Sequence, residues 1–126
     1  MKEKIIEKWI VQYLQSIGAI VEWMQWWKAM ISKWEKTYKM NLQSVWCPDI
    51  ICFYKKEFIW IEVKKDQEEV DSWVNLKNRF LKEWFLPKSY KREENQIIYS
   101  ERILKQWGSF IITCDLEEVI NFIEEL

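Results

Sequence analysis

The chain has 126 residues, a formal net charge of −1 and no histidine. Its length predicts one domain over residues 1–126, and the lack of histidine excludes Ser-His-Asp chemistry and histidine-bound metals. The net charge by itself gives no support for nucleic-acid binding. No apolar run is long enough to span a membrane, and the charged first residues are not typical of a signal peptide. Three cysteines without zinc spacing predict reduced thiols in the cytoplasm.

The N-terminal third combines a helix, a strand and a lysine-rich segment. Apolar residues at helical spacing predict a helix over residues 3–17, which Gly18 ends, followed by a strand over residues 19–25. We expect residues 26–45 to form a long polar loop. Its lysines are candidates for contact with a phosphate backbone, although they can equally serve solubility: Lys28, Lys33, Lys36 and Lys39.

Two short apolar runs in the middle of the chain predict paired strands. They extend from Ile50 to Tyr54 and from Phe58 to Val63, and residues 55–57 form a tight turn between them. Because strand side chains alternate, Glu62 and Lys64 share one face and lie ~7 Å apart along the strand. The hairpin therefore carries an acid and a lysine at one end of an otherwise apolar unit.

Asp49 stands at the start of the first of these strands, next to Glu62 across the hairpin. Two carboxylates that meet on paired strands repel each other, and a divalent cation relieves that repulsion. Oxygen ligands suit Mg²⁺ or Mn²⁺. The alternative is a surface hairpin in which Glu62 and Lys64 form a solvated ion pair.

The remainder of the chain is expected to add two or three helices and a strand. Residues 70–85 form a fair amphipathic helix that ends before Pro87, within a basic insertion at about residues 69–92. This insertion and the residues before it supply three further candidates for DNA contact: Lys65, Lys77 and Arg79. A helix over residues 93–107, a strand over 109–114 and a last helix over 116–125 complete the order, with Asp115 as N-cap.

The combination of Pro48-Asp49 with Glu62-Val63-Lys64 resembles the PD-(D/E)xK nuclease superfamily. It is most similar to the virus-type replication-repair nuclease (VRR-NUC) domain and to the Holliday junction resolvases. The resemblance implies an α/β fold with a restriction-endonuclease-like core, in which helices flank a central mixed sheet. It also implies an Mg²⁺- or Mn²⁺-dependent endonuclease for branched or structured DNA in repair, recombination or phage replication. Such stand-alone domains tend to be homodimers, so we expect a dimer.

The same resemblance implies roles for individual residues. Asp49, Glu62 and the Val63 carbonyl would bind the metal, and Lys64 would orient the attacking water. A first-helix acid would complete the metal site. We prefer Glu7 for this position, with Glu3 as its competitor.

Gln96 lies near the start of the helix expected at residues 93–107. It matches a glutamine of VRR-NUC domains whose amide can order a water or a phosphate. An exposed helix glutamine without such a role is nearly as common. The alternative for the whole chain is a non-cleaving module on the same fold that binds DNA or a protein partner.

The chain has ten tryptophans but only two glycines, where average composition predicts roughly nine glycines. Several tryptophans occupy positions where a turn or small residue is expected: Trp26, Trp27, Trp34, Trp46, Trp60 and Trp84. In the related nucleases a glycine stands at the place of Trp46. We interpret many of these residues as glycines whose UGA codons were translated as tryptophan. A genuinely Trp-rich core or base-stacking surface is the alternative.

Overall fold

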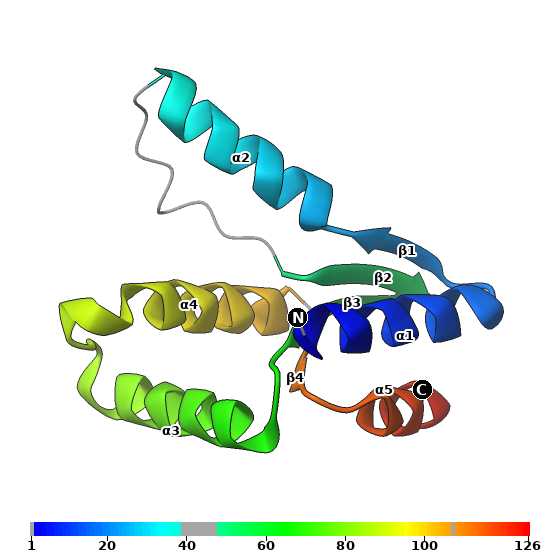
Figure 1. Cartoon of the computed structure of the whole chain (residues 1–126). Coiled ribbons are helices and arrows are strands. Elements are labelled where there is room, and N and C mark those ends of the chain that lie inside the picture. Colours follow the sequence, from blue (N-terminus) through cyan, green and yellow to red (C-terminus); the bar gives the residue numbers. More distant parts are fainter. Residues whose placement is uncertain (1, 39–47, 107) are drawn as a thin grey trace.

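The structure is a computed structural model that describes residues 2–38, 48–106 and 108–126. It is an α/β fold with one four-stranded mixed sheet and flanking helices, as expected from the sequence (Figure 1). The elements follow in the order α1 (Lys2–Ser16), β1 (Ile20–Trp23), α2 (Gln25–Tyr38), β2 (Ile50–Tyr54), β3 (Glu57–Val63), α3 (Gln67–Glu83), the 3-10 helix η1 (Lys88–Tyr90), α4 (Lys91–Lys105), β4 (Ser109–Thr113) and α5 (Leu116–Glu124).

The strands lie in the order β1-β2-β3-β4. The pairs β1–β2 and β2–β3 are antiparallel, and β4 joins β3 in parallel. The parallel step is possible because α3 and α4 form the long connection between β3 and β4 that parallel neighbours require. This topology brings the start of β2 and the end of β3 together at one edge of the sheet.

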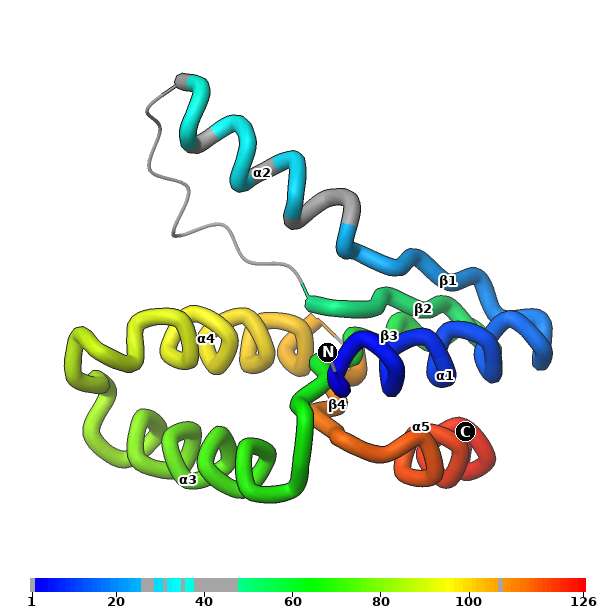
Figure 2. The backbone as a smooth tube through the Cα atoms, in the orientation of Figure 1, coloured from blue at the N-terminus to red at the C-terminus, as the bar shows by residue number. Residues whose placement is uncertain are grey.

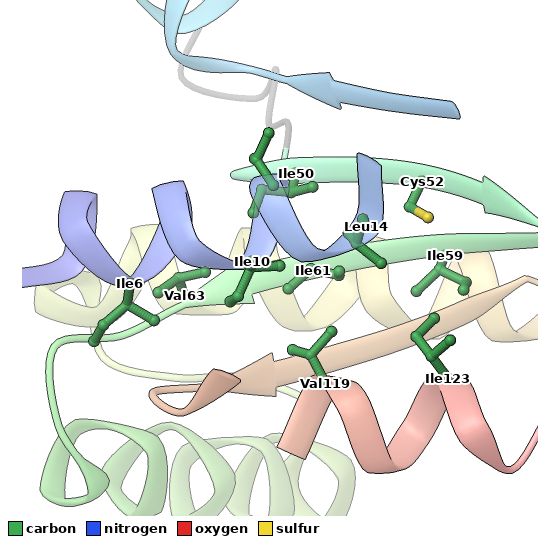
Figure 3. Close-up of a cluster of buried hydrophobic side chains, with 11 residues drawn as sticks. Ile6, Ile10, Leu14, Ile50, Cys52, Ile59, Ile61, Val63, Val119 and Ile123 are labelled. Atoms are coloured by element: carbon green, nitrogen blue, oxygen red, sulfur yellow. The ribbon is translucent and has the colours of Figure 1, made fainter. Parts of the chain in front are cut away.

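One face of the sheet is covered by α1 and α5 and is packed with aliphatic side chains (Figure 3). Ile10 and Leu14 of α1 are fully buried there against Ile59 and Ile61 of β3. The buried thiol of Cys52 belongs to the same cluster, and its desolvation raises its pKa to about 11. This face is the main apolar core, and Cys52 is a core residue with little thiolate character.

The opposite face is covered by α3 and α4 and has a smaller apolar cluster. Trp73 of α3, Ile97 of α4 and Leu86 of the connection between them form its buried part. Trp73 stacks on Phe110 of β4 with 5.6 Å between ring centroids. Apolar packing fixes α3 and α4 on the sheet, and it leaves room on this face for buried polar side chains.

The hairpin between β2 and β3 is tighter than expected, because Glu57 already pairs with Tyr54 and belongs to β3. The loop therefore has two residues, Lys55 and Lys56, with φ angles of 49° and 67°. Two consecutive positive φ angles define a type I′ turn, whose twist matches that of the flanking strands. The register Ile50↔Ile61 follows from this turn and would place Asp49 opposite Glu62.

Residues 26–38 are helical, so the polar loop expected over residues 26–45 is wrong for this part. Apolar residues recur here every three or four positions, and this period favours a helix despite the many lysines. Figures 1 and 2 show α2 leading away from the sheet after β1. Lys39 and Trp46 lie outside the described residues, as do the side chains of Trp26, Trp27 and Lys28.

The segment expected as a basic insertion folds as α3 and η1. Asp66 is the N-cap of α3, since its carboxylate accepts a hydrogen bond of 2.9 Å from the backbone N–H of Glu69. The helix ends at Trp84, which has left-handed backbone angles with φ of 66°. Within the described residues, no helix is both long enough and apolar enough to cross a membrane.

Candidate active site at the ends of β2 and β3

Asp49 lies in the plane of the sheet, immediately before β2. Its carboxylate Oδ2 accepts a hydrogen bond of 2.7 Å from the backbone N–H of Val63. The backbone carbonyl of Asp49 accepts a second hydrogen bond, of 2.9 Å, from the backbone N–H of Met24. The side chain thus continues the β2–β3 ladder beyond the last backbone pair. The sheet positions Asp49 next to the Glu62-Val63-Lys64 segment.

The N–H and C=O of one strand residue project towards the same neighbouring strand. Because the Val63 N–H meets Asp49, the Val63 carbonyl also projects to the Asp49 side of β3. On the other side of β3, the backbone N–H of Lys64 donates a hydrogen bond of 2.8 Å to the carbonyl of Thr113. This bond extends the pairing of β3 with β4. The backbone around Lys64 is therefore fixed from both neighbouring strands.

Glu62 is 1% exposed and lies on the face covered by α3 and α4. Gln96 of α4, also 1% exposed, donates from Nε2 to Glu62 Oε1 over 3.4 Å. The indole N–H of Trp73 donates to Gln96 Oε1 over 2.9 Å. An indole can only donate, so it fixes the Gln96 amide with its NH₂ group towards the carboxylate. Glu62, Gln96 and Trp73 form a buried polar chain that links β3, α4 and α3.

Lys64 is partly exposed and lines a cavity of about 270 Å³. The cavity lies between the first turn of α1, the end of β3 and the α3–α4 pair, and Trp73 forms part of its wall. Lys64 therefore points into solvent-accessible space next to the buried chain. Trp73 connects the wall of this cavity to Glu62 through Gln96, whereas Glu62 and Asp49 do not line the cavity themselves.

The two candidate acids of α1 have different surroundings. Glu7 is 5% exposed and accepts a hydrogen bond of 2.9 Å from the indole N–H of Trp23, on the face that α1 covers. Glu3 instead lines the cavity that contains Lys64. The acid that lies with Lys64 in this structure is thus Glu3, whereas Glu7 lies against β1.

The basic candidates differ in how far nearby acids neutralise them. Lys65 pairs with Glu69 at 3.6 Å, and Arg79 pairs with Glu83 at 3.3 Å. Lys77 of α3 pairs with Glu101 of α4 at 3.3 Å, and its ammonium lies 5.8 Å from the Trp73 ring centroid.

Lys77 therefore ties the two helices together. Lys33 and Lys36 are exposed on α2.

The donor chemistry at this site suits Mg²⁺ or Mn²⁺, because Asp49, Glu62 and the Val63 carbonyl offer only oxygen atoms. Across residues 2–38, 48–106 and 108–126, no group of three or more His, Cys, Asp or Glu side chains is arranged to hold a metal ion. Mg²⁺ does not require such a group, since it commonly retains several waters and binds through one or two carboxylates. Two carboxylates and one carbonyl match the type of ligand that a largely hydrated Mg²⁺ takes.

No family model, curated protein or solved structure matches this chain. The resemblance to nucleases consequently depends on the spacing of Pro48-Asp49 and Glu62-Val63-Lys64 and on the local geometry that these residues adopt.

Sequence reasoning did not identify Trp73 or Trp23 as partners of the candidate residues. The Trp73 indole contacts Gln96, which is 23 residues away in the chain, and the Trp23 indole contacts Glu7, which is 16 residues away. No local motif marks such contacts.

Proposed function

We propose that this chain is a metal-dependent deoxyribonuclease that hydrolyses phosphodiester bonds. The observation that carries the proposal is the hydrogen bond from Val63 N–H to Asp49 Oδ2, which joins the Pro-Asp and Glu-x-Lys segments at one edge of the sheet. The four-stranded mixed sheet with helices on both faces agrees with a restriction-endonuclease-like core.

The residues at this edge divide the chemistry between them. Asp49, Glu62 and the Val63 carbonyl would hold Mg²⁺ or Mn²⁺, which when bound lowers the pKa of a water and offsets charge on the phosphate. Gln96 holds the Glu62 carboxylate in one orientation. The Lys64 ammonium orients the attacking water or stabilises negative charge on the phosphate as the P–O bond breaks.

Cleavage of plasmid and of branched DNA in the presence of Mn²⁺ tests this proposal. Wild type should cut, whereas Asp49→Asn and Lys64→Ala should each lose activity by about 100-fold or more. Lys105→Ala removes an exposed lysine at the end of α4 and should cut at the wild-type rate. Equal activity of all four proteins, or no activity of the wild type on any substrate, would contradict the proposal.

A second candidate is a non-cleaving module that binds DNA or a protein on the same fold. It is favoured by the engagement of Glu62 with Gln96 and of Glu7 with Trp23, because these contacts occupy carboxylate oxygens that a metal would use. DNA binding that persists without measurable Mn²⁺ affinity would support this second function.

We further propose that the substrate is branched or structured DNA and that two copies act together as a cytoplasmic homodimer. Two active sites in one dimer can address two strands of a junction. A cleavage panel of junctions, flaps and duplex ends would identify the substrate. A monomeric mass by sedimentation at micromolar concentration, with and without DNA, would contradict the dimer.

A further inference from the structure

The cavity beside Lys64 has a composition that the proposed cleavage reaction does not require. Besides Lys64 and Trp73 it is lined by Glu3, Tyr90, Arg92 and Glu93. At about 270 Å³ it is slightly smaller than a typical pocket for a drug-sized ligand, so it suits one ring system. The cavity adjoins the buried polar chain through Trp73, whose indole N–H is 2.9 Å from Gln96.

Most charged side chains in the wall of this cavity are not engaged by other groups of the described chain. Four charged side chains of the wall make no hydrogen bond or ion pair to other parts of the described chain: Glu3, Lys64, Arg92 and Glu93. Glu69, which also lines the cavity, already accepts from the Lys65 backbone and pairs with its ammonium. Because the proposed reaction uses Lys64, the groups left for a further ligand are one donor group, Arg92, and two acceptor groups, Glu3 and Glu93, which face a common space.

This balance of charge argues against a second phosphate in the cavity, besides the one at which Lys64 acts. Two carboxylates beside two cations offset the attraction that an isolated pair of cations would have for an anion. A neutral ring with adjacent donors and acceptors uses both kinds of group. The exposed edge of an unpaired nucleobase has this character, since bases carry amino donors next to ring-nitrogen and carbonyl acceptors.

An aromatic side chain and an aliphatic one complete the wall. Tyr90 is 38% exposed at the junction of η1 and α4, and Leu76 of α3 is partly buried. A base that enters the cavity can stack on the Tyr90 ring while its edge meets the charged groups. Unpaired bases are accessible to such contacts, whereas stacked bases of a duplex are not.

We propose that this cavity binds one unpaired nucleobase next to the phosphate at which Lys64 acts. The inference rests on the proposed function, and it names the feature of the substrate that the enzyme selects. The enzyme would recognise a nucleotide that has left the base stack, as occurs at flaps, junctions and frayed ends, and it would discriminate against fully paired DNA.

The test uses a DNA flap whose first unpaired base is 2-aminopurine, an adenine analogue that loses fluorescence when it stacks on an aromatic ring. The full chain is titrated into this DNA in EDTA, so that binding is observed without cleavage. Wild type should quench the fluorescence and bind the flap about tenfold more tightly than the matched duplex. Tyr90→Ala should lose the quenching and the preference, whereas Tyr90→Phe should retain both.

Phe85→Ala provides the matched control, because Phe85 is an exposed aromatic residue of the same connection and does not line the cavity. It should behave as wild type. Quenching by Tyr90→Ala equal to that of wild type, or equal affinity of wild type for flap and duplex, would overturn the inference.

Plasmid cleavage with Mn²⁺, measured in parallel, separates this inference from the proposed function. Cleavage by wild type without a Tyr90-dependent flap preference overturns the base site and leaves the nuclease in place. Tyr90-dependent quenching without any cleavage supports base binding and overturns the nuclease in favour of a non-cleaving DNA-binding module.

Discussion

The two faces of the sheet differ in what they bury. The face under α1 and α5 is filled mainly with aliphatic side chains such as Ile10, Leu14 and Ile61 (Figure 3), and its buried Glu7 accepts a hydrogen bond from the Trp23 indole. The face under α3 and α4 buries a carboxylate, an amide and an indole, in Glu62, Gln96 and Trp73, as one hydrogen-bonded chain. Burying a carboxylate costs stability unless its partners are well placed, so the second face is poorly explained by stability alone. The first face is the main apolar core, and the second carries the connected chain of buried polar groups that includes Glu62 and Gln96.

The largest effect that separates the two faces is expected from truncation in the aliphatic core. Ile61→Ala removes a fully buried side chain from the centre of this core and should lower the free energy of unfolding by about 2–5 kcal/mol. Ile5→Ala on the exposed side of α1 should change it by less than about 0.5 kcal/mol. Urea unfolding measures both. A small loss for Ile61→Ala would mean that the main core lies elsewhere.

A smaller effect is expected from breaking the polar chain while retaining its packing. Trp73→Phe keeps a ring against Phe110 but removes the N–H that Gln96 Oε1 accepts. The buried amide then lacks its donor, which should cost about 1–2 kcal/mol. Trp9→Phe, at a residue that is 52% exposed, serves as the control and should be nearly neutral.

A double-mutant cycle with Gln96→Leu sharpens this prediction. In the Gln96→Leu background the amide oxygen is already absent, so Trp73→Phe no longer leaves a buried acceptor without its donor. The double variant should therefore be more stable than the sum of the two single changes predicts. Additive losses in urea unfolding would show that Trp73 and Gln96 act independently.

The smallest effect concerns the connection that follows α3. Trp84 has φ of 66° and is 77% exposed, although glycine is the preferred residue at such a helix end. Trp84→Gly should therefore raise the free energy of unfolding by about 1 kcal/mol. Leu81→Gly, at an exposed position inside the same helix, should lower it by about the same amount. A loss of stability in both variants would contradict this explanation.

Trp84 also bears on the unusual number of tryptophans. Its positive φ is one that glycine adopts without strain, so the mis-decoding hypothesis predicts a UGA codon at this position. Trp34, by contrast, lies inside α2, where the structure has no positive φ, so the conformational reason for glycine that holds at Trp84 does not apply there. The codons themselves distinguish these cases: UGG at all ten positions would exclude mis-decoding.

Much of the fold could be predicted from local patterns. The β2–β3 hairpin, the N-cap Asp115 and the long helices follow from apolar periodicity and capping residues, whereas α3 begins at Gln67 rather than at residue 70 because Asp66 caps it. The helix α2 is less evident, because its lysines are typical of a polar loop although apolar residues recur between them at helical spacing. Tertiary contacts account for the other differences, since no local signal pairs Trp23 with Glu7 or Trp73 with Gln96.

The candidate site was predictable to the extent that the hairpin determines it. Register alone places Asp49 opposite Glu62, and the alternation of the strand places Lys64 on the Glu62 side. The position of α1 relative to this edge depends on packing, and this is why Glu3 rather than Glu7 shares the cavity with Lys64. The cavity itself arises from α1, β3, α3 and α4 together, which no single segment reveals.

Titration calorimetry with Mn²⁺ is the most direct test of the claim that the polar face is a metal-dependent catalytic centre. Wild type should bind Mn²⁺ at a site that both Asp49→Asn and Glu62→Gln abolish, while urea unfolding shows that both variants remain folded. Ile5→Ala should bind as wild type does. The absence of Mn²⁺ binding by the wild type, or unchanged binding by both carboxylate variants, would contradict the claim.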